Sequence, residues 1–185
     1  MTISPNIDKY IKDSLINGKV CRFNKSNISV FITNIIADMP EGKKQDYYWI
    51  VRQAMQIWNK FSAVNFIETN TQNADIIVNW TKVGIKNEGN CKYRSIIANE
   101  IKAITIEIGL DNEYSPKIIN NSTILHTCLH EFGHSLGLGH GVDTEDLMFV
   151  PHQKTLNSPS KNDLCVLNLL YKNQLGTTFE NLIRY

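Results

Sequence analysis

The sequence predicts one domain with a mixed α/β architecture. Short runs rich in Ile and Val are typical of strands, and a long amphipathic segment separates the first of these runs from the next. The chain has 185 residues, which is one domain's worth and enough to bury about 70% of the unfolded surface. An order of strand, helix, strand and strand indicates helices packed on a mixed sheet.

The first half of the chain supplies most of the predicted sheet. Apolar residues recur every three or four positions in 46–61 and predict an amphipathic helix. Before and after it, β-branched runs predict strands at 28–36, 64–68 and 74–80. Residues 1–27 are polar and aperiodic, with a short helical turn near 8–16, and we expect them to form an N-terminal arm or a possible latency segment.

The second half begins with two further strands, 91–97 and 100–110, which a tight turn at Ala98 and Asn99 would join. A helix then starts near Asn121 or Ser122, both good N-caps, and runs to about Gly137. The last predicted helix covers 161–171, and residues 172–185 form a C-terminal tail. Its predicted capping box joins Ser160 and Asp163.

Most of the functional information lies in residues 129–151. Because residues four apart share one face of a helix, His130 and His134 can offer two imidazoles to one ion. Glu131 lies one step round the helix, where it can act on a metal-bound water. His140 becomes a third ligand if Gly137, which can adopt positive φ, ends the helix and turns the chain back.

The extended motif resembles that of the metzincin zinc endopeptidases and is most similar to the matrixins, because Met148 follows His140 by eight residues. The resemblance covers about residues 28–171, which we take as the catalytic domain. It implies a twisted mixed sheet of about five strands with an antiparallel edge strand. It further implies a backing helix, an active-site helix, a Met-turn beneath the metal and a C-terminal helix.

Two positions depart from the matrixin pattern. Matrixins usually carry Ser where this chain has Gly141, and their Met-Tyr-Pro turn is here Met148-Phe149-Val150-Pro151. These departures concern the subfamily and the specificity pocket rather than the metal site.

We therefore predict a zinc-dependent endopeptidase that holds one catalytic Zn²⁺ through His130, His134 and His140. Glu131 would take a proton from a metal-bound water and pass it to the departing amine. One alternative is a narrower metzincin of another branch. Another is a metzincin fold that binds metal and peptide with little or no turnover, which would have no need of Glu131.

The resemblance also implies where a peptide substrate binds. In matrixins the substrate pairs with the edge strand, which we place on Tyr93, Arg94, Ser95 and Ile96; the alternative is a hairpin strand without a ligand. His126 matches a position that shapes the pocket for the side chain after the cut, although it could equally be an ordinary packed histidine. Pro151 is a further candidate for substrate binding.

Composition excludes several other partners. Hydrophobic residues make up 42% of the chain, charged residues 20%, and the net charge is +1, so no basic surface for nucleic acid or membrane is indicated. We expect a monomer whose partner is a peptide or protein substrate. Neither a signal peptide nor a transmembrane stretch is apparent, so the expected location is cytoplasmic, or external by a non-classical route.

The remaining metal-binding and sulfur residues predict little further chemistry. Of five histidines, three are assigned and His126 and His152 remain, too few for the second, structural zinc site of many animal matrixins. Calcium is not supported, because Asp143, Glu145 and Asp146 fit solvated turn residues. The four cysteines lack any C-x-x-C, and whether two of them pair is left open. Cys21 as a zinc-blocking switch is disfavoured, because the glycine of the matrixin pro-segment motif is missing.

Overall fold

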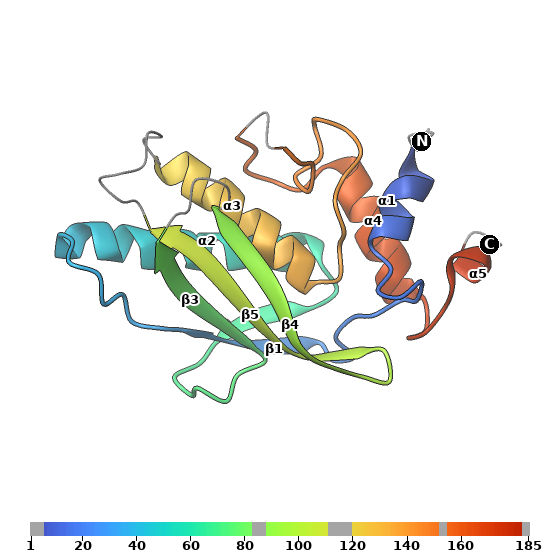
Figure 1. The fold of residues 1–185 in the computed structure, drawn as a ribbon, viewed down its shortest axis with the longest axis horizontal. Coiled ribbons are helices and arrows are strands. Elements are labelled where there is room, and N and C mark those ends of the chain that lie inside the picture. Colours follow the sequence, from blue (N-terminus) through green and yellow to red (C-terminus); the bar gives the residue numbers. More distant parts are fainter. Residues whose placement is uncertain (1–5, 83–87, 111–119, 152–154, 183–185) are drawn as a thin grey trace.

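A five-stranded mixed sheet forms the base of the molecule in the computed structural model, which describes residues 6–82, 88–110, 120–151 and 155–182 (Figure 1). The strands lie in the order β2-β1-β3-β5-β4. They are β1 (Asn27–Ile32), β2 (Asn65–Glu68), β3 (Ile76–Lys82), β4 (Gly89–Ile97) and β5 (Glu100–Leu110). All neighbours pair in parallel except β4, which runs antiparallel to β5 at one edge. The predicted mixed sheet with an antiparallel edge strand is confirmed.

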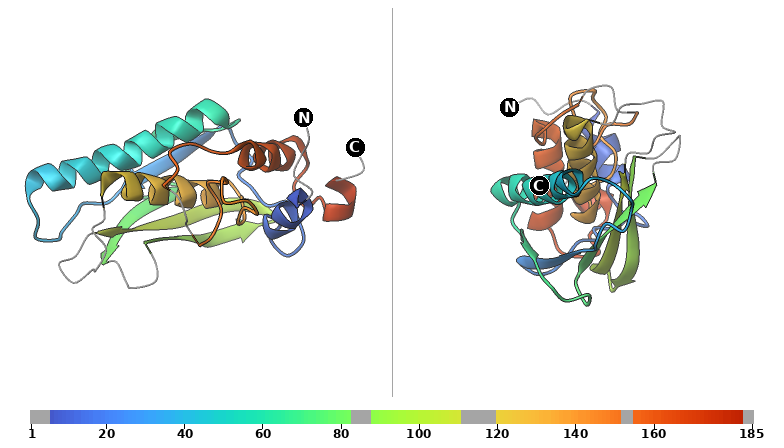
Figure 2. Two further views of the ribbon diagram at one scale, coloured as in Figure 1. Left: turned by 90° about the horizontal axis from the view of Figure 1, so that it is seen from above. Right: turned by 90° about the vertical axis from the view of Figure 1, so that its left-hand side faces the viewer.

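Two long helices, α2 (Glu41–Phe61) and α3 (Asn121–Ser135), lie side by side on one face of this sheet (Figures 1 and 2). The buried indole of Trp58 on α2 donates a 2.9 Å hydrogen bond to the carbonyl of Leu129 on α3. Helix α2 begins five residues earlier than the predicted position 46. Its first residues, EGKKQ, are polar, so apolar periodicity does not detect them.

The strand ends also differ from the prediction. Strand β1 stops at Ile32, four residues early, and Ile36 is 98% exposed, so the β-branched run continues beyond the sheet. Strand β3 starts at Ile76, two residues later than predicted, and the carboxylate of Asp75 before it accepts hydrogen bonds from the backbone and hydroxyl of Ser29. The tight turn at Ala98 and Asn99 is confirmed: both residues have positive φ, 51° and 64°, as a type I′ hairpin turn requires.

The N-terminal segment is part of the core, so a free arm does not describe residues 6–25. Helix α1 (Ile7–Asp13) packs on α4 (Lys161–Lys172), and Tyr10, Val20 and Phe23 are almost fully buried. Tyr10 shares one face of α1 with Ile7 and Ile11, whereas Val20 and Phe23 lie outside any helix or strand, so no period in the sequence predicted their burial. The C-terminal tail, which ends in α5 (Phe179–Leu182), covers this segment, and Val20 N–H donates to the carbonyl of Thr177 at 2.9 Å.

All four cysteines are free thiols, which settles the question of pairing. Cys21 and Cys128 are buried, whereas Cys91 and Cys165 are partly exposed. Among the described residues, no helix combines the length and the apolar character that crossing a membrane would need.

Candidate active site

The site is built on α3, whose start is fixed one residue before the predicted caps. The side chain of Asn120 accepts a 2.9 Å hydrogen bond from the backbone N–H of Thr123, which satisfies a free donor of the first turn. Asn121 and Ser122 already belong to the helix. Every residue from Ile124 to Gly133 is buried, so packing holds the helix in place along most of its length.

Helix α3 ends in a Schellman motif around Gly137, which has φ +95°. Leu138 N–H donates to the carbonyl of Gly133 at 3.2 Å, and Gly137 N–H donates to the carbonyl of His134 at 2.9 Å. A side chain at this position would also meet the carbonyl of Cys21, since a Cβ on Gly137 would lie 2.8 Å from it. The positive φ turns the chain back and brings His140 toward the helix.

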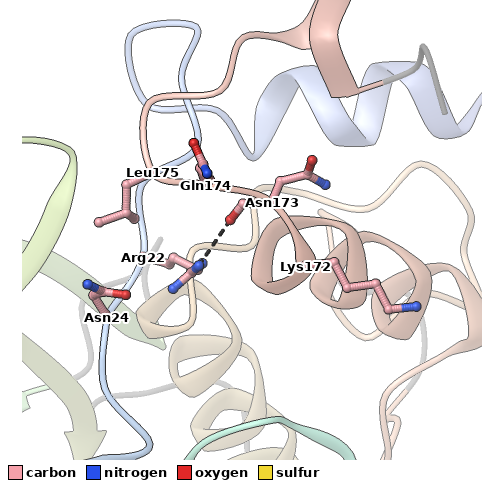
Figure 3. A pocket seen from close by; sticks show the side chains of 6 residues that line it. All are labelled: Arg22, Asn24, Lys172, Asn173, Gln174 and Leu175. Atoms are coloured by element: carbon pink, nitrogen blue, oxygen red, sulfur yellow. Dashed lines mark hydrogen bonds between the residues drawn. The ribbon is translucent and has the colours of Figure 1, made fainter.

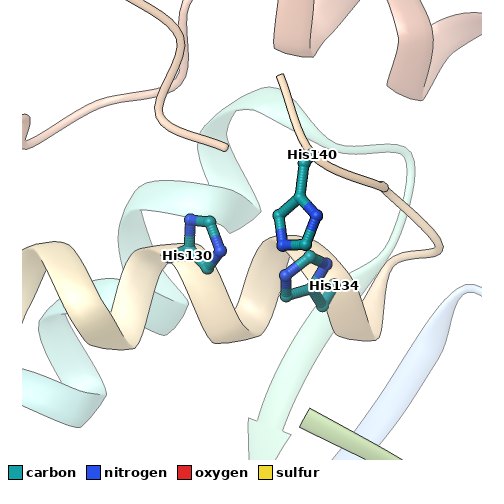
Figure 4. Close-up of side chains that lie close together, drawn as sticks. All are labelled: His130, His134 and His140. Atoms are coloured by element: carbon teal, nitrogen blue, oxygen red, sulfur yellow. The ribbon is translucent and has the colours of Figure 1, made fainter. Parts of the chain in front are cut away.

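Three histidines converge as a result. Metal-binding ring nitrogens of His130, His134 and His140 all lie within 4.8 Å of one another (Figure 4). His130 Nδ1 lies 3.1 Å from the carbonyl of Leu147, and His134 Nδ1 lies 2.8 Å from that of Leu138. Because a carbonyl accepts, these contacts place the proton on Nδ1 and leave Nε2 of both rings as a lone-pair donor. The donor set fits a zinc ion with three imidazole ligands and one open position.

Glu131 is buried beside these rings and is not itself one of the three converging groups. Its side chain is 6% exposed, and its Oε2 has no hydrogen-bond partner among the described residues. Burial raises the pKa of this carboxyl to about 8. Gly89 of β4 lies against it, and a Cβ there would come within 2.9 Å of Glu131 Oε1. The close approach of strand and helix therefore depends on glycine.

Met148 lies under α3 and is fully buried. Its sulfur packs against Gly133, one residue before His134, where any side chain on the helix would collide with it. A soft, unbranched side chain suits this narrow space between the helix and the turn. Met148 thus lies against the helix that carries His130 and His134.

The loop between His140 and Met148 corrects one expectation, because Asp146 is 2% exposed rather than solvated. Its Oδ2 accepts from the backbone N–H of Val142 at 3.0 Å and of Asp143 at 2.9 Å. Its Oδ1 accepts from the hydroxyl of Ser160 at 2.7 Å. A Cβ on Gly141 would lie 2.6 Å from the Cβ of Asp146, so the buried carboxylate explains the glycine where matrixins usually carry Ser.

The edge strand approaches the site through its first half. Gly89 faces Thr127 and Glu131, and the hydroxyl of Tyr93 donates to the carbonyl of His134 at 2.8 Å. Because Gly109 N–H bonds the carbonyl of residue 88, the antiparallel alternation turns the N–H and C=O groups of residues 89, 91 and 93 away from β5.

The other residues of the predicted substrate edge lie further along β4, toward the hairpin turn (Figure 1). The register shifts on both sides of Ser95, and Arg94 reaches the carbonyl of Ala74 at 3.4 Å. Ile96 is partly buried. Of the four predicted edge residues, only Tyr93 contacts α3 through a hydrogen bond given by its side chain. The predicted strand begins at residue 91, so sequence reasoning left Gly89 outside the strand, and it did not include Cys91 among the candidate edge residues.

The structure places the two candidates for the substrate pocket differently, because His126 is buried and Pro151 is exposed. His126 is 4% exposed, and its Nδ1 accepts from Leu156 N–H at 3.0 Å. Burial is the main cause that lowers the pKa of His126. Pro151 is exposed. His152, the remaining histidine, lies outside the described residues.

Cys21 lies apart from the three rings. Its sulfur is 3.9 Å from the carbonyl of Ile16 and 4.0 Å from Asn99 Oδ1, and its side chain is 1% exposed. Burial raises the pKa of this thiol. These contacts agree with the structural thiol that the sequence favours.

The sequence of this chain is similar to a known protein family and to several known proteins. A family model described as matrixin matches residues 22–172. Interstitial collagenase from Bos taurus is 25% identical over 142 residues, which are 73% of this chain and 29% of the relative. Macrophage metalloelastase from Oryctolagus cuniculus is 25% identical over 69% of this chain and 28% of the relative. Stromelysin-1 from Equus caballus is 25% identical over 81% of this chain and 33% of its own length. The chain thus spans about a third or less of these curated relatives.

Proposed function

The chain belongs to the matrixin family, and on that premise we propose that it is a zinc-dependent endopeptidase that cuts extended peptides. One observation carries the proposal: three histidine nitrogens converge within 4.8 Å beside a buried glutamate. Pure binding of metal and peptide would not need a carboxyl group at this position.

The histidines support zinc as the resident ion, because Nδ1 of His130 and of His134 is engaged by a carbonyl and Nε2 is left for the metal. When bound there, zinc supplies Lewis acidity: it lowers the pKa of water and polarises a carbonyl oxygen. No serine or cysteine nucleophile is then needed.

Glu131 is the proposed general base. Its Oε2 has no partner among the described residues, so an oxygen is available to a water molecule or a substrate amine. The carboxylate takes a proton from water as oxygen attacks the scissile carbonyl, and it returns that proton to the departing nitrogen.

The first half of β4 is the proposed docking strand for substrate. Outward N–H and C=O groups at residues 89, 91 and 93 can pair with an extended peptide beside Glu131. The proposed pairing with substrate therefore lies closer to the start of β4 than the sequence predicted. Tyr93 belongs both to the predicted edge and to the edge proposed here. Pairing through the backbone accepts many sequences, so specificity has to come from side-chain pockets.

His126 and Pro151 remain proposals for the pocket that receives the side chain after the cut. The hydrogen bond from Leu156 N–H fixes the orientation of the His126 ring, which supports a role for this ring in limiting the depth of the pocket. The expected result is a preference for smaller residues after the cut, which a peptide library with His126→Leu would shift toward larger ones. An unchanged preference would exclude His126 from this role.

The deciding experiment measures cleavage of a quenched peptide with and without a zinc chelator. Glu131→Ala should keep zinc and lower kcat/KM by about 10²–10⁴-fold, the usual contribution of a general base. Glu145→Ala, an exposed glutamate in the loop after His140, is the matched control and should cleave normally. A parent chain that binds zinc without cleaving would favour the binding-domain alternative, and a Glu131→Ala variant that still cleaves would remove the proposed base.

A further inference from the structure

We propose that Asp13, at the C-terminal end of α1, is a positioning residue for the third metal ligand, so that the N-terminal segment completes the zinc site. Asp13 Oδ2 accepts a 2.6 Å hydrogen bond from the backbone N–H of His140. The same oxygen lies 3.6 Å from His140 Nδ1. The inference rests on the proposed zinc function and concerns how that site is held.

His140 needs such a partner more than the other two rings do. His130 and His134 stand on a buried helix, and each Nδ1 faces a backbone carbonyl. His140 lies beyond the end of that helix, where its Nδ1 faces the Asp13 carboxylate instead. A carboxylate near Nδ1 favours the tautomer that presents Nε2 to a metal, and its hydrogen bond to the backbone N–H fixes the position of His140.

The contact with α1 is built by more than one group. Ser14, which is 2% exposed, accepts a 2.8 Å hydrogen bond from Gly139 N–H and donates a 2.9 Å bond to the carbonyl of Tyr10. Gly139 leaves no room for a side chain, since a Cβ there would lie 2.6 Å from Ser14 N. Two successive N–H groups of the ligand loop are therefore captured by two successive residues of the N-terminal segment.

Helix α1 is also tied to the Met-turn. The hydroxyl of Tyr10 donates a 2.7 Å hydrogen bond to Asp163 Oδ1. The other oxygen of Asp163 accepts from the backbone N–H of Leu147, next to Met148, at 2.9 Å. One short helix thus contacts the loop that carries His140 directly, and it is linked to the turn beneath the histidines through Asp163.

The rest of the N-terminal segment is anchored by Arg22. Its guanidinium donates to the carbonyls of Leu170 and Asn173, each at 3.0 Å, in a surface hollow at the end of α4 (Figure 3). Arg22 therefore joins the N-terminal segment to the end of α4. These bonds also hold the chain that leads back to Asp13 against the body of the domain.

This arrangement differs from a latency segment. A blocking residue would join the ring nitrogens that converge on the metal, whereas Asp13 contacts the backbone and Nδ1 of a ligand. Its removal should loosen the metal site, and it should not release a blocked one.

The test compares the zinc dissociation constants of full-length variants, measured by competition with a chromophoric chelator. Asp13→Ala should weaken zinc binding by about 10–100-fold, as removal of a ligand's outer partner typically does. Asp13→Asn keeps an acceptor for His140 N–H and should fall between the parent and Asp13→Ala. Asp8→Ala removes an exposed charge from the same helix and should bind zinc as the parent does.

A second readout is the visible spectrum of the cobalt-substituted protein, which reports ligand geometry and should change in Asp13→Ala but not in Asp8→Ala. Unchanged zinc affinity in Asp13→Ala, or an equal loss in Asp8→Ala, would overturn the proposal. So would faster cleavage by Asp13→Ala at unchanged affinity, which would indicate latency. A parent chain without zinc affinity would overturn the proposed function as well, so the two failures are distinguishable.

Discussion

The histidines on α3 and the histidine after it reach one point by different means. His130 and His134 owe their position to helix geometry and to a buried helix. His140 depends on contacts with Asp13 and Ser14, which bind it and its neighbour Gly139 across 127 and 125 residues of sequence. Two of the three ligands are thus placed by local spacing, and the third is placed by contacts with a distant part of the chain. Substitutions in the core around α3 should lower the stability of the fold, whereas substitutions in the contact with Asp13 should lower the affinity for the metal.

The largest effect is expected from a core residue of α3. Phe132 is fully buried and packs edge to face on Phe66, with ring centroids 4.9 Å apart. Phe132→Ala should lower the free energy of unfolding by about 3–5 kcal/mol, because it leaves a cavity. Urea denaturation of the metal-free protein measures this change. If the folded variant also lost more zinc affinity than Asp13→Ala, the effects on stability and on metal affinity could not be assigned to different parts of the site.

The stability of the metal-free protein should depend on pH because of Glu131, which lies between His130 and His134 in the sequence. Its pKa is about 8 in the folded chain and 4.5 when unperturbed, so the folded state keeps a proton that the unfolded state releases. Stability of the metal-free protein should therefore be highest below pH 4.5 with respect to this group and fall as the pH rises toward 8. The free energy of unfolding should change by up to roughly 5 kcal/mol over this range.

Glu131→Gln should remove this part of the pH dependence. Urea denaturation at several pH values, with the parent and the variant in parallel, measures the difference between the two slopes. Identical slopes would mean that the carboxyl is ionised in the folded metal-free chain at neutral pH.

A smaller stability effect, with a larger effect on zinc, is expected from Gly139→Ala. The new methyl group would meet the backbone of α1, 2.6 Å from Ser14 N, and would push the ligand loop away from Asp13. Such overpacking costs about 1–3 kcal/mol. Zinc titration should show weaker binding, as in Asp13→Ala. Normal zinc affinity in this variant would show that the contact with α1 does not position His140.

The smallest effect is expected from Gly42→Ala, which is the control for the preceding substitution. Gly42 lies in the first turn of α2, and nothing lies within 4 Å of an added Cβ. The variant should be more stable by about 0.4–1 kcal/mol, since alanine restricts the unfolded chain. Thermal unfolding measures this shift, and zinc affinity should not change.

Much of the fold was predictable because its signals are local. The β-branched runs, the amphipathic period of α2 and the capping box at Ser160 and Asp163 each depend on neighbouring residues. The capping box is present, with Ser160 accepting from Asp163 N–H at 3.0 Å. Within the site, the convergence of three histidines and the positive φ of Gly137 followed from spacing and from the need for a turn.

The features that the sequence did not predict depend on contacts between residues that are distant in the chain. Asp146 looks like a turn residue in sequence, yet it is buried because Ser160 and the loop's own N–H groups converge on it. The burial of Tyr10 depends on α4, a partner far along the chain. The approach of β4 to Glu131 is set by the packing of strand against helix, and a strand pattern alone does not show which half of the strand makes it.

The anchoring of the N-terminal segment has a consequence for biosynthesis. Arg22 is bound to carbonyls at the end of α4, and Val20 pairs with Thr177. A ribosome releases these partners after almost all of the domain has been made, so α1 cannot take its final place earlier. If Asp13 is needed to hold His140, the nascent polypeptide stays poor in zinc affinity until its last elements emerge. The order of synthesis would then delay the assembly of the metal site.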